Sequence, residues 1–312
     1  MKKLLTQLLI CPACLPGEYS LEIENIHQAE GEDIVDGILI CPRCGRRFPI
    51  NEGIAFLDLE SRDQRQTGKY EQDEVVSSYL WSHYGDLLGD EQATDAYRRW
   101  AGLMEPHSGL ALDLGGAVGR FAFEMSGKCD LVVCLDKSRA FIKAARRFMR
   151  EGELRFTLKD EGLLGREVVI RCPAHWQRER VEFIVADAQR LPFATHAATS
   201  LASLNLVDKV PQPWVHLAEM NRVADRSGCQ LLLSDPFSWS TEAAEMEQWL
   251  GGRADGPFPG KGVENIKAIL AEDRGENSPG WQITNQDHVW WKIRSHSNHY
   301  ELIRSCYIKA ER

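Results

Sequence analysis

The sequence predicts an α/β protein: a parallel, doubly wound sheet with a small cysteine-containing module in front of it. From Leu110 onward, short apolar runs alternate with helix-like segments, which is typical of parallel strands joined by helices. A glycine-rich turn at residues 115–119 follows the first of these runs. Two Cys-x-x-Cys pairs near the start of the chain indicate a second, smaller unit. With 312 residues, the chain has room for one large and one small domain.

The individual elements follow from the local patterns. Apolar runs predict strands near 110–114, 131–135, 181–185, 200–205 and 229–234, and two antiparallel strands over 280–309 that close the sheet. Two further runs, 153–158 and 166–171, predict a β-hairpin inserted at about 151–178. The charged residues between 60 and 74 are expected to be a linker, and 74–104 has helical spacing. A helix is expected after Trp239, followed by a Gly/Pro-rich loop that continues to Gly262.

Four cysteines have the spacing of a metal site. Cys11 and Cys14 form one Cys-Pro-x-Cys knuckle, and Cys41 and Cys44 form the other. Each knuckle directs two thiolates at one ion, and four thiolates give a closed shell, so we expect a structural Zn²⁺ rather than a catalytic one. Two disulfides or a redox pair are the alternatives, disfavoured by a cytoplasmic location and by the doubled knuckle respectively. The remaining cysteines lie mostly in strand-like runs and are expected to fill the core.

Composition limits the class of partner. The net charge of −9 and the isoelectric point near 5.6 disfavour a nucleic acid, whose phosphates normally meet a basic surface. No apolar run approaches the roughly 20 residues of a membrane helix, so no membrane partner is expected. The first ten residues imitate a signal peptide but run into Cys11 without a small-residue cleavage site, which favours a cytoplasmic protein.

Acidic residues end the strands that follow the glycine turn. Asp136 ends the second predicted strand, where a carboxylate meets the two hydroxyls of a ribose, and Asp187 follows the third, beside the place of an adenine. These positions predict an adenosine-containing cofactor. A dinucleotide fingerprint is not present, because Ala117 and Arg120 stand where its second and third glycines belong. A glycine turn that caps a helix without any ligand is the alternative.

The residues Asp113-Leu-Gly-x-x-x-Gly119, together with Asp136, Asp187 and the run 203–208, resemble the class I S-adenosylmethionine methyltransferases. The resemblance implies a doubly wound seven-stranded sheet over 106–312 and S-adenosylmethionine as cofactor. It also implies a helical lid within 59–105, although plain packing against the sheet fits that segment equally well. The cofactor contacts implied by the resemblance are Asp113, Gly115, Ala117, Gly119, Asp136, Lys137, Asp187, Ala188 and Asn205.

Residues 1–58 resemble the zinc-ribbon proteins that activate tRNA and translation-factor methyltransferases. The resemblance lies in Leu8-Leu-Ile-Cys-Pro-x-Cys and in Leu39-Ile-Cys-Pro-x-Cys-Gly-Arg-Arg-Phe-Pro-Ile-Asn-Glu-Gly-Ile54. In that family the ribbon is usually a separate subunit. Its fusion here implies a built-in module that stabilises the enzyme or presents its substrate.

The methyl acceptor is expected beside Asn205 and Asp208, which follow the fourth strand at the topological switch point. A helix N-cap is the alternative role of Asp208. The pattern Asn205-Leu-x-Asp208, with Asp235-Pro-Phe-x-Trp239 and other runs in 106–252, resembles the methyltransferase domain that ends ovothiol synthases, and also protein-histidine and carnosine methyltransferases. The resemblance implies that Asn205 and Asp208 orient an imidazole, and Tyr300 is a candidate to line the pocket. Two residues depart from the pattern, since Gly116 replaces a Cys and Lys209 replaces an Arg.

These observations predict an S-adenosylmethionine-dependent N-methyltransferase that acts on an imidazole-containing small molecule or a peptide histidine. Two alternatives stay open. The ribbon favours an RNA or translation-factor methyltransferase, which the acidic charge opposes. A non-catalytic scaffold that retains the cofactor fold is the other.

Overall fold

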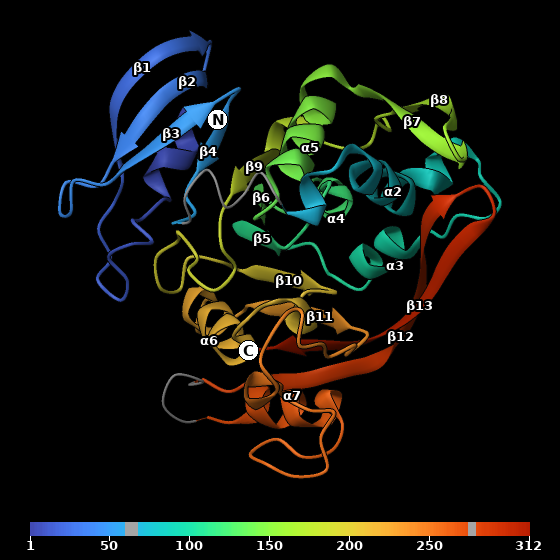
Figure 1. The fold of residues 1–312 in the computed structure, drawn as a ribbon. Helices are drawn as coiled ribbons and strands as arrows, with labels where there is room; N and C mark the ends of the chain where they lie inside the picture. Colours follow the sequence, from blue (N-terminus) through green and yellow to red (C-terminus); the bar gives the residue numbers. More distant parts are fainter. Residues whose placement is uncertain (60–67, 274–278) are drawn as a thin grey trace.

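The computed structural model describes residues 1–59, 68–273 and 279–312, and its centre is a large mixed sheet (Figure 1). Eleven strands follow the order β1-β2-β3-β4-β9-β6-β5-β10-β11-β13-β12, and β7 pairs with β8 in a separate hairpin. The strands are β1 (Glu22–Glu30), β2 (Asp33–Ile40), β3 (Arg47–Asn51), β4 (Ile54–Phe56), β5 (Leu110–Leu114), β6 (Leu131–Asp136), β7 (Glu153–Glu161), β8 (Leu164–Arg171), β9 (Val181–Val185), β10 (Ser200–Leu204), β11 (Gln230–Asp235), β12 (Gln282–His296) and β13 (His299–Glu311). The α-helices are α2 (Asp73–Tyr84), α3 (Ala96–Gly102), α4 (Arg120–Met125), α5 (Arg139–Glu151), α6 (Pro213–Val223) and α7 (Gly262–Ala271).

The predicted doubly wound sheet is confirmed. Strands β9, β6, β5, β10 and β11 are parallel, and β13 pairs antiparallel with both β11 and β12. The chain passes outward from β5 to β6 and β9 on one side, and from β10 to β11 on the other. The order therefore reverses between β5 and β10, where α/β sheets bind their ligands.

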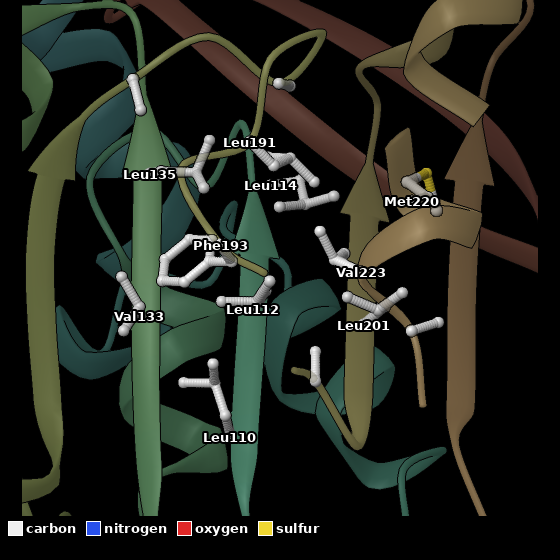
Figure 2. Close-up of a cluster of buried hydrophobic side chains, with 14 of the residues drawn as sticks. Leu110, Leu112, Leu114, Val133, Leu135, Leu191, Phe193, Leu201, Met220 and Val223 are labelled. Carbon is white, nitrogen blue, oxygen red and sulfur yellow. The ribbon is translucent and has the colours of Figure 1, made fainter. Parts of the chain in front are cut away.

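Helices cover both faces of the sheet. Alternate residues of β5 point to opposite faces. Figure 2 shows Leu110, Leu112 and Leu114 on one face, in the buried cluster that also contains Met220 and Val223 of α6. The other face packs against α2, α3, α4 and α5 through a second buried cluster. These strands are buried along their whole length and most of their residues are apolar, which explains why they could be predicted from apolar runs.

The cysteine module continues the central sheet. Its strand β4 lies parallel to β9, with Phe56 opposite Val185, and Leu57 N donates to Val185 O at 2.8 Å. Beside this junction, buried Arg146 of α5 binds Asp33 of β2 and Glu182 of β9, the latter at 3.2 Å. Buried side chains of the module belong to the same cluster as those of β5 and α6.

The helix expected after Trp239 and the linker predicted between 60 and 74 are the two predicted segments that the structure does not confirm. Residues 239–249 contain only the 3₁₀ turn Met246–Gln248, so the helix expected there is wrong; Trp239 stacks on Trp249 and folds the segment back on itself. The helix forms instead at Gly262–Ala271, after the Gly/Pro-rich loop. The linker predicted between 60 and 74 lies, over 60–67, outside the described residues. Within the described ranges, every helix is too short or too polar to span a bilayer.

Candidate active site

The glycine turn after β5 has a backbone that only small residues accept. Gly115 and Gly119 have φ values of +67° and +81°. A Cβ atom on Gly119 would lie 2.4 Å from the Phe183 ring, and one on Gly115 would lie 2.7 Å from Leu206 Cδ1. Glycine is therefore required at both positions by conformation and by space.

Asp136 joins this turn to the turn after β6. Its carboxylate accepts hydrogen bonds from Ala117 N at 3.0 Å and from Ser138 N at 2.8 Å. Each carboxylate oxygen retains a further lone pair, so the group can still accept from two hydroxyls. Burial raises the pKa of Asp136 to about 6.

Asp113 lies under the same turn and is fully buried. Its Oδ2 has no hydrogen-bond partner among the described residues. A Cβ atom on Gly116 would lie 2.3 Å from this oxygen, so the glycine leaves Asp113 its space. Burial raises the pKa of Asp113 to about 7. The Cys134 thiol of β6 lies against the same carboxyl group, since a Cβ atom on Gly116 would also lie 2.5 Å from Cys134 Sγ. Asp113 is therefore enclosed between the turn and β6.

The turn after β9 lies beside the turn after β6 at the same edge of the sheet. Ala186 N donates to Asp136 O at 3.1 Å, and Lys137 Nζ lies 3.6 Å from Asp187 Oδ2. The Ala188 carbonyl lies 3.1 Å from Nδ1 of buried His216, a residue of α6. The structure therefore brings the residues expected to contact the cofactor together along the carboxyl ends of β5, β6, β9 and β10.

Asn205 and Asp208 lie together at the end of β10. Asn205 has a φ of +59°, and its N donates to Ser234 O at 2.6 Å. The buried Asp208 carboxylate accepts from Ser238 N at 2.6 Å and pairs with Lys209 at 3.1 Å through the same oxygen, Oδ2. Its Oδ1 has no partner within the described parts of the chain.

A second buried carboxyl, Asp235, lies beside Asp208 and accepts from Asp208 N at 3.2 Å. Burial raises the pKa of both groups, and the charge of Asp208 raises that of Asp235 further. Sequence reasoning did not place Asp235 in the site. Its position at the end of β11 was the available signal, since neighbouring parallel strands end at the same edge.

Tyr300 is not brought together with these residues. It lies at the tip of the β12–β13 hairpin, where its ring packs 5.5 Å from that of Trp81. There it lines a pocket of about 830 Å³ between residues 88–92 and the β7–β8 hairpin, with Asp160 and Arg294 among its neighbours. The β13 residue that does reach Asn205 is Ser305.

The four cysteines of the knuckles converge on one point. Their sulfur atoms all lie within 4.8 Å of one another, with Cys11–Cys44 and Cys14–Cys41 each at 3.8 Å. A tetrahedral zinc with bonds of about 2.3 Å has sulfur–sulfur edges of about 3.8 Å. The donor set and its spacing therefore fit a closed tetrahedral metal site.

Several solved structures have a fold similar to that of this chain. The chain is similar to the YcgJ protein from Bacillus subtilis, with 14% identity and a TM-score of 0.45 over 69% of this chain and 98% of that one. A SAM-dependent methyltransferase from Methanosarcina mazei is 16% identical with a TM-score of 0.44, over 68% of this chain and 95% of that one. A chain from the complex between the Haloferax volcanii Trm112 methyltransferase activator and its methyltransferase is 13% identical with a TM-score of 0.43, over 75% of this chain and 98% of that one.

Two parts of the chain match known families. Residues 2–53 match the family described as Trm112p-like protein, and residues 112–232 match the family described as methyltransferase domain. None of the curated proteins matches the chain. The second family covers the strands and turns that carry Asp113, Asp136, Asp187 and Asn205. Residues 112–232 are thus similar to a methyltransferase domain, and residues 2–53, which precede them, are similar to the Trm112p-like proteins.

Proposed function

We propose that this enzyme methylates a ring nitrogen of an imidazole-bearing small molecule or of a histidine in a peptide. The observation that carries the proposal is the open Oδ1 of Asp208, a buried carboxylate oxygen without a partner among the described residues, three positions after Asn205 at the switch point. A buried acceptor of this kind is suited to an N–H group, which imidazole carries opposite its nucleophilic nitrogen.

The residues along the carboxyl ends of β5, β6, β9 and β10 would hold the cofactor. Asp136 has lone pairs left for the ribose hydroxyls, and Asp187 and Ala188 lie where the adenine is expected. Asp113 would support the turn from beneath. S-adenosylmethionine, when bound, supplies the methyl group. Asp208 would hold the imidazole N–H and accept its proton as the other nitrogen forms its new bond. The cysteine cluster would hold a structural Zn²⁺.

The test is the Asp208→Asn variant. Turnover of histidine, carnosine and a histidine-containing peptide with labelled S-adenosylmethionine should fall by roughly a hundredfold, because the amide cannot accept the proton. Calorimetric binding of S-adenosylhomocysteine should stay unchanged. Asp130→Asn serves as the matched control, since Asp130 lies at the opposite, amino-terminal edge of β6. Equal turnover in wild type and Asp208→Asn would refute the assigned role.

A second candidate is an RNA or translation-factor methyltransferase, which the match of residues 2–53 to the Trm112p-like family favours. The net charge of −9 opposes an RNA acceptor. Labelled methyl groups in RNA or in a translation factor, with none in the imidazole compounds, would select this candidate.

A further inference from the structure

A chain of two hydrogen bonds ends on the side chain of Asn205. Trp291 Nε1 in β12 donates to Ser305 Oγ in β13 at 2.9 Å, and Ser305 Oγ donates to Asn205 Oδ1 at 2.5 Å. Ser305 is fully buried and Trp291 almost so. Side chains held in this way have little freedom to rotate.

The chemistry of the three groups fixes the direction of this chain. An indole nitrogen only donates, so Ser305 Oγ must accept from Trp291. Ser305 Oγ has a second lone pair, so an amide nitrogen could also donate to it, but the buried hydroxyl hydrogen of Ser305 would then have no acceptor among the described residues. The oxygen of the Asn205 amide is the partner that satisfies this hydrogen. The orientation of the amide is thereby determined by a donor on the neighbouring strand.

The amide nitrogen is consequently the part of Asn205 that is left open. Nδ2 is buried and has no hydrogen-bond partner in the ranges 1–59, 68–273 and 279–312. The backbone cannot turn to relieve it, because Asn205 N is bound to Ser234 O and φ is +59°. A buried N–H group without a partner is costly, which makes Nδ2 a site for an incoming lone pair.

We propose that Trp291 and Ser305 are positioning residues, which lock Asn205 so that the active site presents an N–H₂ donor. The inference rests on the proposed function and narrows its substrate class. The ligand atom opposite Asn205 must carry a lone pair, as a carboxylate or carbonyl oxygen does, while an N–H of the acceptor meets Asp208. A primary amine or amide whose N–H groups need the Asn205 oxygen is disfavoured, because Ser305 occupies that oxygen.

The orientation can be tested without any acceptor. In protein labelled with ¹⁵N at Asn and Trp, the Asn205 NH₂ signals are identified by their loss in Asn205→Asp, and the Trp291 indole signal by its loss in Trp291→Phe. Ser305→Ala should shift both sets of signals. Thr284→Ala, which removes a hydroxyl from the same hairpin, should shift neither. Short proton–proton contacts between the Asn205 NH₂ group and the Trp291 indole N–H would show the reversed amide and overturn the inference.

Binding then identifies the source of the lone pair. Asn205→Asp keeps an acceptor for Ser305 but removes the donor, so one dissociation constant should rise about tenfold or more. A rise for S-adenosylhomocysteine alone assigns the lone pair to the cofactor. A rise for L-histidine in the presence of S-adenosylhomocysteine, with none for imidazole, assigns it to the carboxylate of the acceptor. Unchanged constants for both overturn the inference. If no imidazole compound binds wild type, the proposed function fails, while the amide orientation and the S-adenosylhomocysteine constant still decide this inference.

Discussion

At the scale of single residues, the site is built from buried carboxyl groups and the half-buried Asp136. Asp113, Asp136, Asp208 and Asp235 end parallel strands or follow them closely, and burial is the largest cause of the raised pKa of each. Polar groups buried with incomplete hydrogen bonding cost stability and are retained where they serve a ligand. Their concentration at one edge of the sheet marks that edge as functional.

Asp113 should make stability depend on pH. Its pKa is raised from 3.8 to about 7, so the folded state binds this proton more tightly than the unfolded state does. Its contribution is therefore fully present below about pH 4 and is lost as the pH rises towards 7. The Asp113→Asn variant has no group that ionises at this position, so it does not lose stability in this way as the pH rises. In urea unfolding at pH 5 and pH 8, the variant should gain stability relative to wild type at the higher pH, by at least about 1 kcal/mol.

The exposed Asp130→Asn variant is the control for this measurement and should follow wild type at both pH values. A free energy of unfolding that changes equally with pH in wild type and Asp113→Asn would contradict the prediction. It would mean that Asp113 is ionised in the folded protein at pH 5.

Single residues also show how far sequence reasoning reaches. Asp136, Asp187 and Asn205 could be predicted, because parallel strands deliver their carboxyl ends to one edge whatever their exact register. Ser305 and Trp291 could not, because their place depends on the pairing of β13 with β11 and β12, which alternation along a strand does not reveal. Tyr300 was chosen from the same hairpin, but the register puts Ser305 beside Asn205.

At the scale of elements, the junction between β4 and β9 depends on Arg146. Its guanidinium lies between Asp33 and Glu182 and close against Gly53, where a Cβ atom would come within 2.2 Å of Arg146 Nη2. A buried pair that loses one partner leaves an uncompensated charge, so displacing Arg146 is costly.

Gly53→Ala should therefore destabilise the protein more than Gly31→Ala. Both glycines have a positive φ, +75° and +60°, but a Cβ atom on Gly31 meets nothing within 4 Å. Both alanine variants therefore suffer the same kind of backbone strain, but only Gly53→Ala also brings a Cβ atom into collision with Arg146. Urea unfolding should give a difference of about 1–3 kcal/mol between the two variants. Equal losses would show that the guanidinium moves aside without cost.

The elements themselves were predicted unevenly. The buried strands β5, β6, β9, β10 and β11 are largely apolar segments bounded by turns, so their positions followed from the sequence. The helix expected after Trp239 did not form, because the stacking of Trp239 on Trp249 is a contact that local propensity does not contain. The extension of the sheet by β4 is likewise a tertiary contact.

At the scale of the whole molecule, the Trm112p-like part and the methyltransferase part share one sheet and one buried cluster. Metal removal should therefore be felt beyond the cysteines. Treatment with a chelator should release about one zinc per chain and lower the unfolding temperature of the entire protein by at least about 5 °C, in a single transition. S-adenosylhomocysteine binding should weaken in parallel.

Differential scanning calorimetry, with the metal measured by mass spectrometry, checks this expectation. Protein that is refilled with zinc controls for damage by the chelator. Two separate transitions, of which only the lower one responds to the metal, would show that the two parts unfold independently despite their common sheet.

The place of β13 has a consequence for biosynthesis. Residues 299–311 lie between β11 and β12, so the last strand among the described residues is an interior one. A nascent polypeptide that still holds these residues in the ribosomal tunnel exposes two open strand edges, and cannot close the sheet until synthesis has passed residue 311.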